Sequence, residues 1–141
     1  AAMEVTTKVN SRPDISGPDD IASLVEAFYK RVYDDEVLRP VFTDVARVNL
    51  EDHLPKMNRF WNTVLFGVHS YRGNPMETHY QLNRMQPLHE CHFLRWLSLW
   101  QMTVDTLFEG PVAERAKASA ERINNNIASN LRHQAPTRKD P

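Results

Sequence analysis

Two histidines of this 141-residue chain stand where the sequence could support metal chemistry. The first, His53, shares one helical face with Met57, Phe60 and Trp61, so its imidazole is expected beside apolar side chains. A buried imidazole needs a partner, and a neutral imidazole is also a common metal ligand. The residues alone leave two interpretations open: a histidine of a functional site, and a core-edge histidine bonded to a backbone carbonyl.

The second histidine, His79, lies in a predicted helix of about two turns, residues 76–83, between two loops. So short a helix buries little surface and is marginal without a group to pack on. A metal bond would explain both the helix and the histidine. A surface or core-edge histidine fits the same spacing.

The predicted helix 88–108 carries a broad apolar face that includes Phe93, Trp96 and Trp100. A stripe of this kind forms either ordinary core or the wall of a cofactor site. The indole N–H of a buried tryptophan also needs a hydrogen-bond acceptor.

Other catalytic patterns have little support in the sequence. His89 and His92 are three residues apart and could meet on one helix face, but no carboxylate accompanies them and Cys91 points elsewhere. The chain contains no HExxH, CxxC, P-loop or GxSxG motif. A hydrolytic cysteine–histidine site therefore has no supporting pattern.

Helices joined by short loops must position these side chains. The chain has only four glycines, each near a break in the apolar periodicity, and it lacks alternating strand-like runs. The first helix opens at Gly17-Pro18 and ends at Asp34-Asp35, and a short helical turn follows over 36–42. The other helices are predicted over 49–66, 76–83, 88–108 and 111–131. The pattern predicts an all-α protein.

The composition is that of one ordinary globular domain: 41% hydrophobic and 25% charged residues, with a net charge of −1. This balance points to no nucleic-acid or acidic-membrane partner. With one cysteine, no apolar run near the ~20 residues of a membrane span and no signal-like start, we expect a cytoplasmic protein. We expect a flexible leader over 1–17, a folded domain over 18–132 and a disordered tail over 133–141.

Three motifs together resemble group III truncated haemoglobin, a bacterial truncated globin family. The first is EAFYKRVY (26–33) with VLRPVF (37–42), similar to the family's distal tyrosine helix and following phenylalanine turn. The second is HLPKMNRFW (53–61), similar to its distal histidine helix. The third begins at GNPM (73–76) and contains His79, with Trp96 seventeen residues later, which is the family's spacing from proximal histidine to distal tryptophan. The resemblance covers about residues 19–131.

The resemblance implies a truncated globin fold, a two-over-two helical sandwich around haem b. His79 would bind the iron, and Tyr29, His53 and Trp96 would line the opposite, distal face. Phe42, Met57 and Trp96 would contact the haem. Lys56 and Arg95 would pair with its propionates, unless they are solvated surface charges.

Three classes of function remain open from the sequence. One is reversible binding of dioxygen, carbon monoxide or nitric oxide by a haem protein, with slow release because several donors face the ligand. Another is a haem enzyme for nitric oxide detoxification or peroxidase-type chemistry, which would need an unidentified reductase. The third is a cofactor-free helical interaction module.

Overall fold

The computed structural model describes residues 12–45, 49–68, 79 and 88–139; for 44–45 and 132–139 it describes the backbone alone. Within these ranges every regular element is helical and there is no strand, which confirms the all-α prediction. The elements are α2 (Pro18–Asp34), the π-helix η1 (Val41–Val45), α3 (Leu50–Phe66), α5 (Glu90–Leu107) and α6 (Pro111–Lys139).

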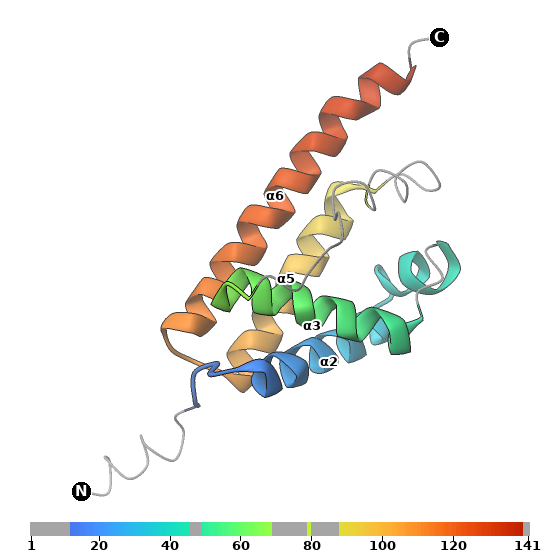
Figure 1. Ribbon diagram of the computed structural model, residues 1–141. Coiled ribbons are helices and arrows are strands. Elements are labelled where there is room, and N and C mark those ends of the chain that lie inside the picture. The colour runs from blue at the N-terminus through green and yellow to red at the C-terminus, as the bar shows by residue number, and fades with distance from the viewer. Residues whose placement is uncertain (1–11, 46–48, 69–78, 80–87, 140–141) are drawn as a thin grey trace, which may run out of the picture.

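Two pairs of helices cross one another. Helix α2 packs against α3, and α5 packs against α6, while α2 also lies against α5 and joins the pairs. Figure 1 shows α2 and α3 running across the direction of α5 and α6. The described helices therefore form two crossed layers, with α2 and α5 in contact between them.

Local sequence explains where α2 and α3 begin and end. Pro18 stands at the start of α2, and Asp19 and Asp20 follow where the helix dipole favours negative charge. The Asn49 side chain accepts a hydrogen bond from the backbone of Glu51 and caps α3. Gly67, with a φ of 70°, closes α3 in the left-handed conformation.

The other predicted helices have shifted ends. The turn predicted over 36–42 is helical from residue 39 and ends as η1, and α5 begins at Glu90. The short helix predicted over 76–83 lies outside the described residues except for His79, which is helical.

Helix α6 continues to Lys139, past the domain end predicted at 132 and through most of the predicted tail 133–141. The disordered tail was predicted because this segment is polar and contains two prolines, Pro136 and Pro141. Extending an existing helix by a residue costs little, and arginine, glutamine, alanine and lysine are good helix formers. The helix is therefore longer than the range 111–131 predicted for it, while the domain boundary at 132 stays a prediction.

The boundary of the predicted leader also moves. Residues 13–17, which we expected in a flexible segment, pack against the folded domain. Ile15 is only 2% exposed, and Asp14 accepts backbone hydrogen bonds from Val112 and Ala113 at the start of α6. A distant carboxylate thus caps α6, so its first turn depends on a segment almost 100 residues earlier in the chain.

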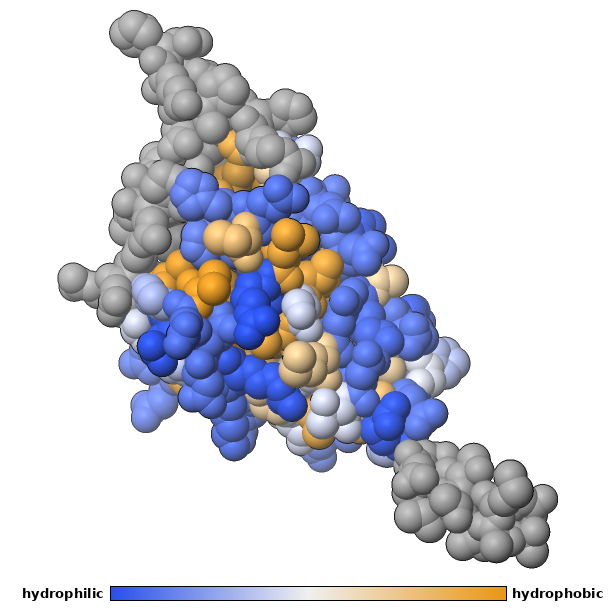
Figure 2. All heavy atoms as spheres, turned by 180° about the vertical axis from the view of Figure 1, so that it is seen from behind, coloured by the Kyte–Doolittle hydropathy of each residue, from blue (hydrophilic) through white to orange (hydrophobic). Residues whose placement is uncertain are grey.

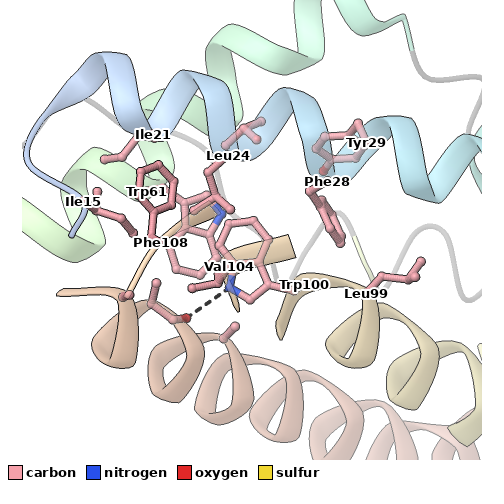
Figure 3. Packing of buried hydrophobic residues seen from close by; sticks show 14 of the residues in the cluster. Ile15, Ile21, Leu24, Phe28, Tyr29, Trp61, Leu99, Trp100, Val104 and Phe108 are labelled. Atoms are coloured by element: carbon pink, nitrogen blue, oxygen red, sulfur yellow. Dashed lines mark hydrogen bonds between the residues drawn. The ribbon is translucent and has the colours of Figure 1, made fainter. Parts of the chain in front are cut away.

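Trp100 lies at the centre of the core, where α2, α3, α5 and α6 meet (Figure 3). It is 1% exposed, its ring stacks on Trp61 with 4.4 Å between centroids, and its indole N–H donates to the carbonyl of Ala116. The α6 residues beneath it are small, and they let the backbone of α6 approach the large indole. These are Ala113, Ala116 and Ala120.

The face of the molecule seen in Figure 2 is mostly hydrophilic, with apolar side chains between charged ones. The exposed large apolar residues of the described part are Val37, Phe66, Val68, Leu94 and Met102. In that part, no helix combines the length and apolar character that crossing a bilayer requires.

Candidate functional site

A hydrogen bond between Tyr29 and His53 joins α2 to α3 in the middle of apolar side chains. The Tyr29 hydroxyl lies 2.8 Å from His53 Nε2, and the two rings meet edge to face with 5.0 Å between centroids. Tyr29 follows Phe28 on α2 and belongs to the same core cluster, but its side chain reaches His53 on α3. It is nevertheless only 6% exposed.

Both partners of this hydrogen bond are neutral at neutral pH. Burial, with a smaller contribution from Tyr33, raises the pKa of the Tyr29 hydroxyl, which keeps its proton. Burial, with a smaller contribution from the charge of Lys56, lowers the pKa of His53. The tautomer of His53 then decides the direction of the bond: either Tyr29 donates to Nε2, or Nε2–H donates to Tyr29 and leaves the hydroxyl proton free for another acceptor.

Aromatic and apolar side chains surround this pair. Phe42, on η1, meets Tyr29 edge to face at 5.7 Å. Trp96, on α5, meets Phe28 in the same way at 5.5 Å. Phe42, Met57 and Trp96 are all half-buried against the core cluster. The structure therefore brings together Tyr29 and His53, which were predicted to be distal residues, and it packs Phe42, Met57 and Trp96 on the same core cluster, with Phe42 directly against Tyr29.

The indole N–H of Trp96 is a further candidate donor. Its ring stacks on that of Trp100 and contacts Phe28, but within the described part of the chain it donates to no protein acceptor. An indole N–H at a partly buried position is favourable where a polar group can reach it.

An ion pair that the sequence did not predict lies beside this group. Asp35, just after α2, is almost fully buried and accepts a hydrogen bond from Arg95 Nε. Burial alone would raise the pKa of Asp35, but the hydrogen bond from Arg95 and those from the amides of Leu38 and Val37 outweigh it and lower the pKa. The sequence did carry a signal for the two amide bonds. An aspartate directly after a helix end commonly accepts from the backbone N–H groups two and three residues later.

The predicted propionate partners have different surroundings. Arg95 is engaged through Nε with Asp35, so the structure gives its guanidinium a role that the sequence did not predict. Lys56 is exposed, one helical turn from His53, and its charge acts on that histidine. Pairing of either residue with a propionate stays a prediction.

His79 is helical and half-buried. The residues on both sides, 69–78 and 80–87, lie outside the described part, so its role as a metal ligand also stays a prediction. Among the described residues, no three histidine, cysteine or acidic side chains gather in a way that could hold a metal ion.

The second histidine pair has a structural role. His92 Nδ1 accepts a hydrogen bond from the backbone N–H of His89 at 2.9 Å and caps the start of α5. Cys91 is exposed between them. This arrangement explains the three-residue spacing without a metal.

Comparison with known proteins gives consistent matches. The family model of bacterial-like globins matches residues 13–129. A group 3 truncated hemoglobin of Campylobacter jejuni is 28% identical over 114 residues, which are 76% of this chain and 87% of that protein. A group 1 truncated hemoglobin of Nostoc commune is 33% identical over 113 residues, 79% of this chain and 88% of that protein.

A solved structure shows the same fold. The crystal structure of the group III truncated hemoglobin from Campylobacter jejuni superposes with a TM-score of 0.76 at 24% identity, and the match covers 85% of this chain and 94% of that one. The crossed helix pairs of Figure 1 are therefore those of a truncated globin.

Proposed function

The chain belongs to the bacterial-like globin family, a membership that implies a haem cofactor, and we propose that it binds dioxygen and other small diatomic ligands at a polar distal site. The observation that supports this most directly is the Tyr29–His53 hydrogen bond among half-buried aromatic side chains. A neutral donor pair in apolar surroundings suits a small ligand with partial negative charge.

The residues around this pair suit a flat apolar cofactor. Phe42, Met57 and Trp96 pack on the core with one side and keep exposed surface on the other. Covering that surface would contribute roughly 25 cal/mol per Å². By resemblance, these residues would contact haem b and His79 would be its iron ligand.

By resemblance His79 would hold the haem, and the haem iron would supply the binding of a diatomic ligand. The protein's part follows from its own groups. Tyr29 and Trp96 would donate hydrogen bonds to the ligand, Phe28 and Met57 would keep water out, and His53 would fix the Tyr29 hydroxyl or release it. A donor in such a dry site contributes more than in water.

Haem uptake and the iron ligand can be tested together. Purified protein titrated with haemin should show a Soret band that saturates at one haem per chain. His79→Gly should bind haem weakly, and added imidazole should restore part of the spectrum. The control His53→Ala should keep the haem and change only ligand kinetics. A folded wild type that takes up no haem would end the proposal, and loss of haem in His53→Ala alone would exchange the two faces.

A second candidate is a haem enzyme of nitric oxide dioxygenation or peroxidase type. Two donors, Tyr29 and Trp96, beside one site favour slow ligand release, which suits redox chemistry better than carriage of a ligand. This function requires an electron donor such as a reductase, and we place it in the cytoplasm. Two rates measured on the wild type separate the two functions. One is the turnover of nitric oxide under dioxygen with a supplied reductant, and the other is the release of the bound ligand.

A further inference from the structure

We propose that Asp35 and Arg95 form a positioning pair, which holds Trp96 and Phe42 in place against Phe28 and Tyr29 of α2. The inference rests on the proposed function, because the site that it positions is the distal ligand site. It concerns the arrangement of this chain's own side chains, and it assigns Arg95 a task other than contact with a propionate.

One carboxylate joins two separate elements. Asp35 Oδ2 accepts hydrogen bonds from the amides of Val37 at 3.1 Å and Leu38 at 3.0 Å, and Oδ1 accepts from Arg95 Nε. The Asp35 side chain is 4% exposed, whereas that of Arg95 is 47% exposed. The guanidinium thus reaches in from the surface and ends at a buried acceptor.

On one side, the Asp35 carboxylate is connected through the turn after α2 to Phe42. Leu38, whose amide Asp35 holds, is buried, and its carbonyl accepts the amides of Val41 at 3.0 Å and Phe42 at 3.3 Å. Two consecutive hydrogen bonds therefore connect the Asp35 carboxylate to the backbone of Phe42. That ring lies against Tyr29.

On the other side, the carboxylate is bonded to Arg95 on α5, and Trp96 is the next residue of that helix. The second half of α5 is fixed by deep burial of Leu99, Trp100 and Val104, but in its first half most side chains keep exposed surface. In this first half, the Phe28–Trp96 ring contact and the Asp35–Arg95 bond join α5 to α2 and its following residue, while Asn124 of α6 donates to the carbonyl of Phe93. An edge-to-face ring contact tolerates sliding, whereas a charged hydrogen bond fixes distance and direction.

Stability alone is a weak reason for this pair. The Arg95 bond and the two amides together offset the cost of burying the Asp35 carboxylate, as its lowered pKa indicates, but replacing such pairs by apolar groups is often neutral or stabilising. A positional role gives the arrangement a purpose: Asp35 connects the two elements that present Phe42 and Trp96 to one site.

Tryptophan indole signals test the position without any ligand. In the full-length chain as purified, labelled at its tryptophans, three indole N–H signals are expected, one each for Trp61, Trp96 and Trp100. Asp35→Asn and Arg95→Met should move or broaden the Trp96 signal. Trp61 should stay unchanged, and Trp100, whose ring stacks on that of Trp96, should move less than Trp96 because the core and the Ala116 carbonyl hold it. Trp→Phe variants assign the signals.

Lys117→Met is the matched control, since it removes ion pairs with Asp105 and Glu114 on the α5–α6 side of the molecule. It should leave all three indole signals in place. If Asp35→Asn and Arg95→Met leave the Trp96 signal unchanged, or move all three signals alike, the positioning role is wrong. Should Asp35→Asn fail to fold, Arg95→Met still decides the question.

Ligand kinetics on haem-loaded protein then separate this inference from the proposed function. Asp35→Asn and Arg95→Met should raise the dioxygen dissociation rate by no more than Trp96→Phe does, about tenfold. In a Trp96→Phe background they should add little, because they act through that side chain. If Trp96→Phe is effective and the pair's variants are not, only the positioning role falls. If the wild type takes up no haem, the proposed function falls, and the indole signals still show whether the pair positions Trp96.

Discussion

Trp100 and Trp96 stand one turn apart on α5 with nearly parallel rings, at 6.1 Å between centroids, yet their surroundings differ. Trp100 is buried, stacks on Trp61 and donates its indole N–H to Ala116. Trp96 is half-buried, and in the described part of the chain its N–H meets no protein acceptor.

The difference shows how one helix serves two purposes. In the region around Trp100, which we call the closed region, the indole N–H of Trp100 already donates to the backbone of α6. This region therefore needs no acceptor from outside the protein. In the open region, around Trp96 and Tyr29, the Trp96 N–H meets no acceptor in the described part of the chain and the Tyr29 hydroxyl is bonded to His53; by our proposal both would donate to a ligand. A region that is satisfied by its own groups should respond to mutation in stability, and a region with donors to spare should respond in binding.

The largest effect is expected at the closed region. Trp100→Ala removes a buried indole and leaves a cavity together with an unpaired Ala116 carbonyl, which should cost about 3–5 kcal/mol of unfolding free energy. Trp96→Ala should cost clearly less, because its side chain is half-exposed. Urea titration of both variants measures the difference. Equal losses would remove the distinction between the two regions.

The next effect is expected at the open region. Tyr29→Phe removes only the hydroxyl, and a hydrogen bond to a partly charged acceptor contributes on the order of 1.5–3 kcal/mol. The dioxygen dissociation rate should therefore rise roughly tenfold or more, while carbon monoxide binding, to a less polar ligand, should change less. Trp96→Phe should act in the same direction. Stopped-flow measurement of both ligands checks this.

Additivity sharpens the same experiment. Since Tyr29 and Trp96 would share one acceptor, the double variant should show less than the product of the two single effects. Trp100→Phe is the matched control, a tryptophan change with an expected loss of stability and unchanged dissociation. Unchanged dissociation in both Tyr29→Phe and Trp96→Phe would mean that no donor of this region reaches the ligand.

The sequence predicted the helices, and it predicted the neighbours of Tyr29 better than the connections between elements. Spacing of three and four residues places Phe28 and Met57 on definite helix faces, so their burial could be inferred. The Tyr29–His53 bond requires α2 and α3 to pack with these two residues opposite each other. Helical spacing does not predict this, and only the family resemblance brought the two residues together.

The missed features share a physical cause. Asp14 and Asp35 both form hydrogen bonds to residues far along the chain or across to another helix, at Ala113 and Arg95 respectively. Nothing in local periodicity specifies such partners, and a single aspartate near a helix end fits a local cap equally well. Arg95 was assigned to a propionate for the same reason: its sequence position shows a charge but not its acceptor.

A smaller effect is expected from the cap that completes the closed region. Asp14→Ala removes the acceptor of the Val112 and Ala113 amides and should cost about 1–2 kcal/mol, as lost helix caps do. Gly110→Ala should act at the same place, because a Cβ there would lie 2.6 Å from Asp14 Cγ and the backbone has a φ of 132°. Ligand dissociation should be unchanged in both. A change in dissociation without a loss of stability would connect this cap to the open region.

The smallest effect is the pH dependence of the Tyr29–His53 bond. Burial lowers the pKa of His53 from 6.5, so between that value and the folded pKa the unfolded chain binds more protons than the native one. This contribution to stability is therefore full above about pH 6.5 and is lost as pH falls toward the folded pKa. His92 has a lowered pKa in the same range, so the wild-type curve contains both histidines.

Comparison of variants isolates the part that belongs to His53. His53→Gln should lose less stability than the wild type between pH 7 and pH 5 in urea titrations, because its side chain no longer takes up a proton on unfolding. Lys56→Gln removes one cause of the lowered pKa while leaving the bond to Tyr29 in place, so it should reduce the acid loss without removing it. If the wild type and His53→Gln have parallel curves, His53 titrates in the native protein as it does in the unfolded chain, and burial beside Tyr29 does not lower its pKa.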